Sequence, residues 1–189
     1  ILERAVADAF PRVRLEAVTA LAKEKDGHAI DLAMRALDAP MDSYLDFAVW
    51  NTVRQLGDSW LPAVETANFE FARDRNKLLF ALDAIESPSA MTPLLKRLEA
   101  EPWSAADRRR ATTIIGRYAN PNQVGQYVAL LGKQTEDHSP SLLAEILLTL
   151  ATETRTRRMK PPGNMEVLST WMSSDDAALI QAVLECGAT

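Results

Sequence analysis

The sequence predicts an all-α fold, a right-handed α-α superhelix of about five helical hairpins plus one extra helix. Two observations carry this prediction. Apolar residues recur in paired helical stripes with a period of 31 to 36 residues, and prolines fall between the stripes or at their starts. A lone hairpin cannot bury both of its faces, so successive hairpins are expected to stack into one continuous core.

The first helix of each period, here called the A helix, is marked by apolar side chains at i, i+3, i+4 and i+7, which share one helix face. Leu143, Ile146, Leu147 and Leu150 form the clearest such stripe. The second members of successive stripes lie 31, 33, 33, 32 and 36 residues apart: Ala17, Ala48, Ala81, Ile114, Ile146 and Ala182. The last interval contains Pro-Pro-Gly at 161–163, which predicts a longer connection there.

A second set of stripes predicts the returning helix of each hairpin, here called the B helix. Clear stripes begin at Ile30, Met91 and Val124, and weaker ones lie around Leu61 and Leu168. The resulting repeats span about 8–40, 41–70, 71–101, 102–134 and 138–173, with a partial sixth over 174–189. We expect 1–189 to be a single repeat domain and a fragment of a larger protein.

Helix caps support the same division into repeats. Ser and Asp are favoured just ahead of a helix because their side-chain oxygens accept hydrogen bonds from the first amides. The residues predicted to do so are Asp42, Ser59, Ser104, Ser139 and Asp175.

Residues 8–23, DAFPRVRLEAVTALAK, resemble the signature of HEAT repeats, in which an Asp, a Pro and a Val-Arg pair precede an Ala and a Leu. In HEAT families the Asp and Arg form hydrogen-bonded ladders between successive repeats. The resemblance therefore implies a structural-ladder role for Asp8 and Arg14. Only the first repeat carries the full signature, with Asp107 and Arg110 as a loose echo.

Residues 8–62 also resemble the HEAT region of membrane-bound dehydrogenases from planctomycetes and verrucomicrobia. In that family the HEAT repeats join a sugar-dehydrogenase propeller to a haem-binding cytochrome c module. The matching positions are Arg14, Glu16, Ala17, Asp42, Leu45, Asp46, Ala48, Leu56, Trp60 and Pro62. The resemblance implies a redox parent in the periplasm or cell envelope; without it we expect the cytoplasm. The chain has no Cys-x-x-Cys-His, so no redox role carries over to its residues.

Composition narrows the classes of partner. Apolar residues make up 47% of the chain and charged residues 25%, the balance of a folded globular protein. No apolar run approaches the roughly 18 residues that span a bilayer, so no membrane insertion is expected from this segment. A net charge of −5 disfavours nucleic acid as a partner. The single cysteine, Cys186, is expected to be a buried apolar residue.

No catalytic, cofactor-binding or metal-binding residue is predicted. His28 and His138 are far apart in the sequence, and the chain has neither a Gly-x-Ser-x-Gly motif nor a glycine-rich phosphate loop. The basic run Arg108, Arg109 and Arg110 is a candidate anion contact; its alternative interpretation is a solvated helix face offset by nearby acidic residues. Trp103, beside a proline at a connection, is the best candidate for an exposed aromatic contact.

The predicted function follows from shape. Stacked hairpins form a curved array whose B helices line a concave surface suited to a peptide or a neighbouring domain. The candidate contacts on that surface are Arg35, Asp38, Lys96, Arg97 and Gln126. We therefore expect a non-catalytic scaffold or protein-interaction module, without a cofactor, that docks or spaces other domains. The sequence sets no oligomeric state.

The alternative is a HEAT-repeat enzyme, such as a DNA-glycosylase-like or bilin-lyase-like protein. A basic groove with a buried carboxylate would favour the first, and a groove lined by Cys or His would favour the second.

Overall fold

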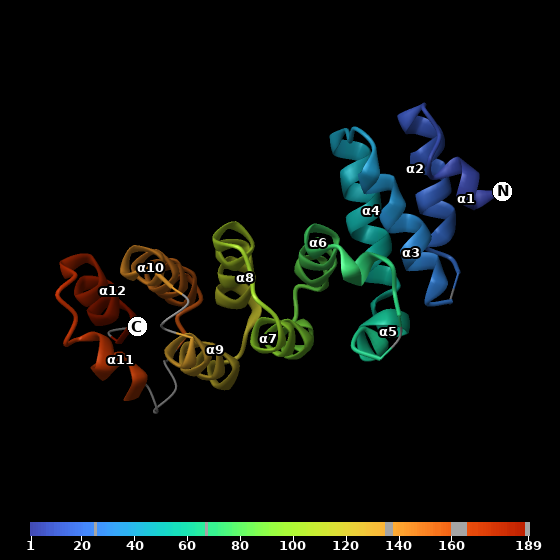
Figure 1. Ribbon diagram of the computed structural model, residues 1–189. Helices are drawn as coiled ribbons and strands as arrows, with labels where there is room; N and C mark the ends of the chain where they lie inside the picture. Colours follow the sequence, from blue (N-terminus) through green and yellow to red (C-terminus); the bar gives the residue numbers. More distant parts are fainter. Residues whose placement is uncertain (25, 67, 135–137, 160–165, 188–189) are drawn as a thin grey trace. The chain divides into compact units, whose positions relative to one another are not determined.

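The computed structural model describes residues 1–24, 26–66, 68–134, 138–159 and 166–187 (Figure 1). Helices hold 76% of these residues, and none of them lies in a β-strand, which confirms the predicted all-α class. The chain forms two compact units, Ile1–Ile85 and Glu86–Thr189. Their boundary falls inside the third predicted repeat, after its A helix. The single-domain interpretation stays a prediction.

Unit 1 contains three A helices that pack in sequence order, α2 on α4 and α4 on α6, while α3 packs against both α2 and α4. Its elements are α1 (Leu2–Ala5), α2 (Pro11–Leu21), α3 (His28–Met34), η1 (Arg35–Asp38), α4 (Ser43–Gln55), α5 (Gly57–Trp60), η2 (Leu61–Ala63), η3 (Phe71–Arg73) and α6 (Arg75–Ile85). Within unit 1 the A helices therefore lie next to one another in sequence order.

The core of unit 1 is built from the predicted stripes and one aromatic cluster. Leu45 and Val49 on α4 are fully buried. Trp60 is also fully buried; its indole Nε1 donates to the carbonyl of Val53 at 3.0 Å, which satisfies the ring's only polar group. Phe71 meets Trp60 edge-on, with ring centroids 5.4 Å apart. Trp60 and Phe71 therefore anchor the centre of the core of unit 1.

The second B helix of unit 1, α5, has four residues, against ten in α7 and thirteen in α9. Instead of a full helix around Leu61, the chain forms only α5 and one turn of 3-10 helix, η2. Pro62 stands at the start of η2, where its missing amide is tolerated but an α-helix cannot run through it. A side chain at Gly57 would lie 2.9 Å from Cδ1 of Ile85, so this short segment packs closely against α6.

Unit 2 contains two rows of helices. The A helices α8, α10 and α12 pack on one another in that order, and the B helices α7, α9 and α11 form the second row. The elements are η4 (Pro88–Ala90), α7 (Met91–Ala100), α8 (Ala105–Tyr118), α9 (Pro121–Lys133), α10 (Pro140–Thr156), α11 (Glu166–Trp171) and α12 (Ala177–Gly187). The predicted longer connection at 161–163 lies outside the described residues.

Two glycines allow close helix crossings in unit 2. A Cβ atom at Gly116 on α8 would lie 2.6 Å from Cβ of Glu153 on α10. A Cβ atom at Gly132 on α9 would lie 2.0 Å from Cγ2 of Val167 on α11. Both distances are shorter than carbon atoms tolerate, so the absence of a side chain sets how near these helices approach.

Three of the five predicted caps are confirmed: the side chains of Asp42, Ser104 and Ser139 accept from backbone amides at the starts of α4, α8 and α10. The other two predictions are wrong. Ser59 lies inside α5. The cap of α12 is Asp176 rather than its neighbour Asp175, because Oδ1 of Asp176 accepts from the amides of Ala178 and Leu179.

Candidate protein-binding surface

The exposed side of the B helices in unit 2 carries two adjoining hollows, which together we call the α7/α9/α11 groove. The first lies between α7 and α9 and has a volume of about 440 Å³. The second lies between α9 and α11 and has a volume of about 310 Å³. Ala129 and Lys133 border both hollows, so the two form one continuous track across three helices.

The helical pattern of the sequence produces this groove. On α7 the residues Met91, Leu94, Leu95 and Leu98 turn into the core. Positions i, i+4 and i+7 of the opposite face then face solvent, and they are Thr92, Lys96 and Glu99. Likewise, α9 presents Gln126, Ala129 and Lys133 to the groove while Val124, Tyr127, Val128 and Leu131 are buried.

The floor of the first hollow is apolar and its rim is polar. Leu95 and Leu130 lie beneath it and are only 9% and 7% exposed. The ammonium of Lys133 on α9 lies 3.5 Å from Oε1 of Glu99 on α7. Both partners are well exposed, so this ion pair contributes little to stability and mainly offsets the two charges.

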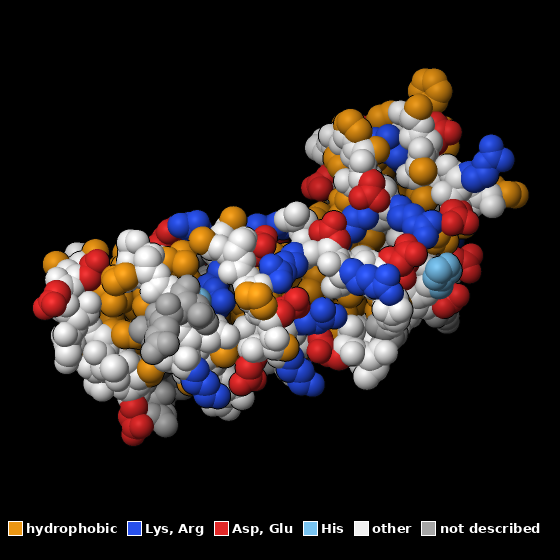
Figure 2. Space-filling model, viewed as in Figure 1, with side chains coloured by type: hydrophobic (Ala, Val, Ile, Leu, Met, Phe, Trp, Pro, Cys, Tyr) orange, Lys and Arg blue, Asp and Glu red, His pale blue; other side chains and the backbone are white. Residues whose placement is uncertain are grey.

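The groove also carries two charges that lie outside this ion pair. Lys96 in the first hollow and Glu166 in the second make no ion pair with any described residue. Since Lys133 is offset by Glu99, the charges left among the described lining residues are the positive one of Lys96 in the first hollow and the negative one of Glu166 in the second. On the face shown in Figure 2, Lys and Arg side chains are interspersed with Asp and Glu along this part of unit 2.

The structure brings two of the predicted contact residues together: Lys96 and Gln126 both line the first hollow. Arg97 lies on the same helix but is directed elsewhere. Its Nη1 atom is 3.5 Å from Oε1 of Glu101, and its carbonyl accepts a hydrogen bond from Nε1 of Trp103 at 3.1 Å.

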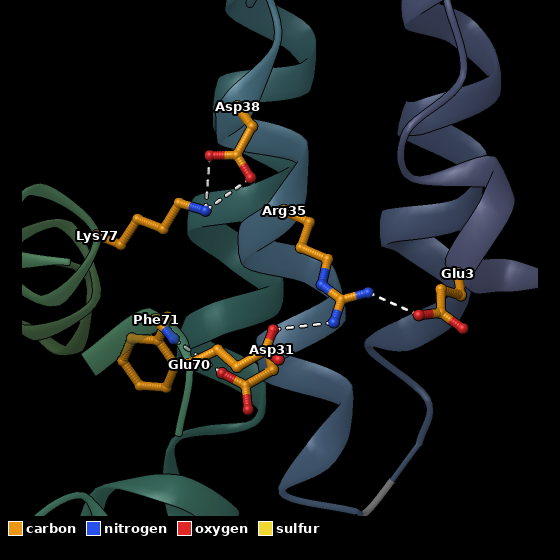
Figure 3. Close-up of polar contacts among 7 residues, drawn as sticks. All are labelled: Glu3, Asp31, Arg35, Asp38, Glu70, Phe71 and Lys77. Carbon is orange, nitrogen blue, oxygen red and sulfur yellow. Dashed lines mark hydrogen bonds and ion pairs between the residues drawn. The ribbon is translucent and has the colours of Figure 1, made fainter. Parts of the chain in front are cut away.

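The other two predicted contacts, Arg35 and Asp38, lie in unit 1 and make ion pairs within it (Figure 3). Arg35 bonds Glu3 at 2.7 Å and Glu70 at 2.9 Å, and Asp38 pairs with Lys77 at 2.7 Å. The hydrogen bonds that Arg35 donates to Glu70 and Glu3 raise the pKa of Arg35, and the bond to Glu70 lowers the pKa of Glu70. Their role as contacts for a partner stays a prediction.

Asp31, one turn before Arg35, anchors the same region. It is buried, and its Oδ1 accepts from the amide of Phe71 at 3.0 Å, joining α3 to η3 across 40 residues (Figure 3). The periodic pattern did not predict this role for Asp31. Its signal was a single acidic side chain inside an apolar stripe, between Ile30 and Leu32.

The three arginines of the basic run differ in exposure. Arg108 is only 3% exposed, and its Nη1 donates to Oε1 of Gln134 at 3.1 Å. Burial leaves Arg108 little surface for an external anion. Arg109 is exposed and pairs with Glu145 at 2.7 Å, and Arg110 is exposed. Anion binding by this run stays a prediction.

Beneath the groove lies a buried polar cluster that the sequence analysis did not find. The hydroxyl of Tyr127 on α9 lies 2.7 Å from Oγ1 of Thr112 on α8, and Oγ1 of Thr112 also donates to the carbonyl of Arg108 at 2.8 Å. Tyr127 is fully buried, and this desolvation raises its pKa to about 12. The cluster ties the groove-forming helix α9 to the A row.

The two residues of the HEAT signature meet through the backbone. Nη1 of Arg14 donates to the carbonyl of Asp8 at 3.0 Å, and its Nη2 donates to the carbonyl of Pro40. The carboxylate of Asp8 instead accepts from the amide of Phe10 at 2.9 Å. All of these contacts lie within the first predicted repeat, so a ladder between repeats stays a prediction.

Trp103, the aromatic side chain that the sequence predicts to be exposed, is not exposed, whereas two aromatic side chains of α4 are. Trp103 is buried, at 8% exposure, because its indole is held by the carbonyl of Arg97; its predicted role as an exposed contact is wrong. Tyr44 and Phe47 on α4 are 77% and 64% exposed instead. Phe47 stacks on Trp50 with centroids 6.0 Å apart. Tyr44, Phe47 and Trp50 recur every three residues outside the buried stripe of α4, and this spacing could have predicted an exposed aromatic patch.

Cys186 is buried as expected, and burial raises its pKa to about 11. Among the described residues, no helix is long and apolar enough to cross a membrane, and no three His, Cys, Asp or Glu side chains are grouped as metal ligands would be.

No protein-family model matches the chain, and no curated protein matches its sequence. Its membership of the HEAT family, and its likeness to the dehydrogenases, therefore stay predictions from the sequence.

Proposed function

We propose that the chain is a non-catalytic protein-interaction module built from HEAT-like hairpins stacked as a right-handed solenoid. It docks a segment of another protein, or of its own parent, in the α7/α9/α11 groove. The observation that carries this proposal is the pair of adjoining hollows across three B helices, with Leu95 and Leu130 as an apolar floor and charges at the rim.

The size and lining of the groove suit side chains of a peptide. Each hollow has a volume of a few hundred Å³ and is open to solvent, and Ala129 between them leaves room for a backbone to lie across α9. Peptide grooves commonly combine apolar pockets for side chains with polar groups that bind the main chain. Gln126 and Thr92 are placed at the rim to serve as such polar groups.

The charges favour a protein over a nucleic acid. Binding to phosphates needs a surface of one sign, because counterion release drives that association. Here the groove carries Lys96 and Lys133 together with Glu99 and Glu166, and the chain has a net charge of −5. The lining that the structure describes includes no Cys or His, and nothing in it favours the glycosylase-like or bilin-lyase-like alternative.

We extend the proposal to the parent protein on the strength of the sequence resemblance alone. In a dehydrogenase of the propeller, HEAT and cytochrome c type, this module would dock or space the redox domains. The catalytic and haem-binding residues would then belong to those other domains.

The proposal is tested by selecting displayed random peptides on the purified chain and measuring the affinity of the selected peptides by calorimetry. Ala129→Trp fills the border between both hollows, and Ala106→Trp, at the exposed start of α8, is the matched control. We expect the selected peptides to bind the wild type and Ala106→Trp with equal affinity, and to bind Ala129→Trp with at least tenfold lower affinity. Selection of no peptide, or equal affinity for both variants, would overturn the proposal.

A further inference from the structure

The two hollows of the groove carry opposite charges, and this arrangement specifies a partner. We infer that the groove binds an extended segment in the polyproline II conformation that has one acidic and one basic residue three positions apart. The acidic side chain lies beside Lys96 in the first hollow, and the basic side chain lies beside Glu166 in the second. This inference rests on the proposed function and names the class of partner.

The charges determine which side chains the hollows accept. Lys96 and Glu166 have no ion-pair partner among the described residues, whereas Lys133 is offset by Glu99 at 3.5 Å. A carboxylate in the first hollow and a cation in the second would each meet an opposite charge. A segment carrying two charges of one sign would be attracted by one hollow and repelled by the other.

The spacing follows from helix packing. The hollows lie on either side of one helix, α9, and the axes of packed helices are roughly 8–10 Å apart. A polyproline II segment rises about 3.1 Å per residue with three residues per turn, so residues i and i+3 share one face and lie roughly 9 Å apart.

Other conformations fit less well. In a β-strand, residues on one face are roughly 6.6 or 13 Å apart, and neither distance matches the roughly 8–10 Å between the two hollows. A helix laid across the groove could place residues seven positions apart at a similar distance, but its own amides and carbonyls are already paired. The unpaired carbonyls of a polyproline II segment can instead accept from Gln126, Thr92 and Lys133 at the rim.

The probe is a fluorescent proline-rich peptide containing Glu-Pro-Pro-Arg, measured by polarisation with the full chain. Peptides with the order Arg-Pro-Pro-Glu, with spacings of two and four, and with two Glu residues are compared with it. An alanine-rich helical peptide with Glu and Arg seven positions apart tests the competing conformation. We expect a spacing of three, in one of the two orders, to bind at least fivefold more tightly than every other peptide.

Charge variants of the protein complete the test. Lys96→Glu and Glu166→Lys are each expected to weaken the preferred peptide by roughly five- to tenfold. The double variant exchanges the two charges, so it is expected to bind the peptide of opposite order with the original affinity. Lys23→Glu, an exposed site in unit 1, is the control and should change nothing.

The outcomes separate this inference from the proposed function. If selected peptides require an open Ala129 but show no preference for opposite charges three apart, the inference is wrong and the peptide groove stands. Tightest binding by the helical peptide, or no recovery in the double variant, would also overturn it. Failure of all peptides, selected and designed alike, would overturn both.

Discussion

Arg14 offers a direct test of how the start of unit 1 is held together. Arg14 is only 3% exposed, and its guanidinium donates to two backbone carbonyls, those of Asp8 before α2 and Pro40 before α4. Replacement by Met keeps much of the apolar stem but removes both donors. The carbonyls of half-buried Asp8 and exposed Pro40 would then each lose a charged hydrogen-bond partner.

The expected cost follows from those two bonds. A hydrogen bond to a charged group contributes about 1.5–3 kcal/mol, and the desolvation of the buried guanidinium opposes part of that gain. We therefore expect Arg14→Met to lower the free energy of unfolding of unit 1 by about 2–4 kcal/mol. With a denaturant slope of about 1–2 kcal/mol/M, the urea midpoint falls by about 2 M.

The assay is urea unfolding followed by tryptophan fluorescence. Trp50 and Trp60 report on unit 1 once Trp103 and Trp171 of unit 2 are replaced by Phe in every protein compared. Arg12→Met, at an exposed position of the same helix, is the control and should change stability by no more than about 0.5 kcal/mol. Equal midpoints for Arg14→Met and its control would refute the role given to these two bonds.

Three further predictions concern single features of the fold. Because burial raises the pKa of Tyr127 to about 12, above the unfolded value of about 10, its contribution to stability is complete below pH 10 and is lost as the pH rises toward 12. The urea midpoint of the wild type should fall across this range, and that of Tyr127→Phe should fall much less. At neutral pH Tyr127→Phe should lower the free energy of unfolding by about 1 kcal/mol, because the hydrogen bond to Thr112 is lost. Gly132→Ala should destabilise unit 2 by about 1–3 kcal/mol, measured by urea unfolding, because its Cβ would meet Val167. Glu86 follows α6 with a φ of 50°, a left-handed conformation that glycine adopts more easily than glutamate. Glu86→Gly should therefore raise the melting temperature and the free energy of unfolding, the latter by about 0.5 kcal/mol after the greater freedom of glycine in the unfolded chain is subtracted.

Each of these predictions has an outcome that would contradict it. An unchanged pH dependence in Tyr127→Phe would show that another group causes the alkaline loss. For Gly132→Ala, the additional change Val167→Ala should recover most of the stability, and equal stability of the wild type and the single variant would show that α9 and α11 are not in close contact. A lower melting temperature for Glu86→Gly would show that the left-handed backbone is not strained.

The all-α class and the core could be predicted because helical periodicity is a local property. The stripe around Leu45 and Val49 and the one around Leu94 and Leu98 are buried as the spacing indicates. The residues outside the apolar stripe of a B helix are predicted to face solvent, and this places Lys96 and Gln126 on the exposed sides of α7 and α9. The sequence pattern failed around Leu61, where Pro62 limits the segment to α5 and one turn of 3-10 helix.

By itself, then, the sequence determined which residues form helices and which face of each helix is apolar. Only the tertiary structure decided which exposed side chains from different helices meet, because that depends on how closely the helices pack. Gly132 allows α11 to approach α9, which places Glu166 across Ala129 from Lys96. The packing of α7 on α9 likewise brings Lys133 to Glu99, 34 residues earlier in the sequence. The oppositely charged hollows arise from packing distances, which helical periodicity within one segment does not encode.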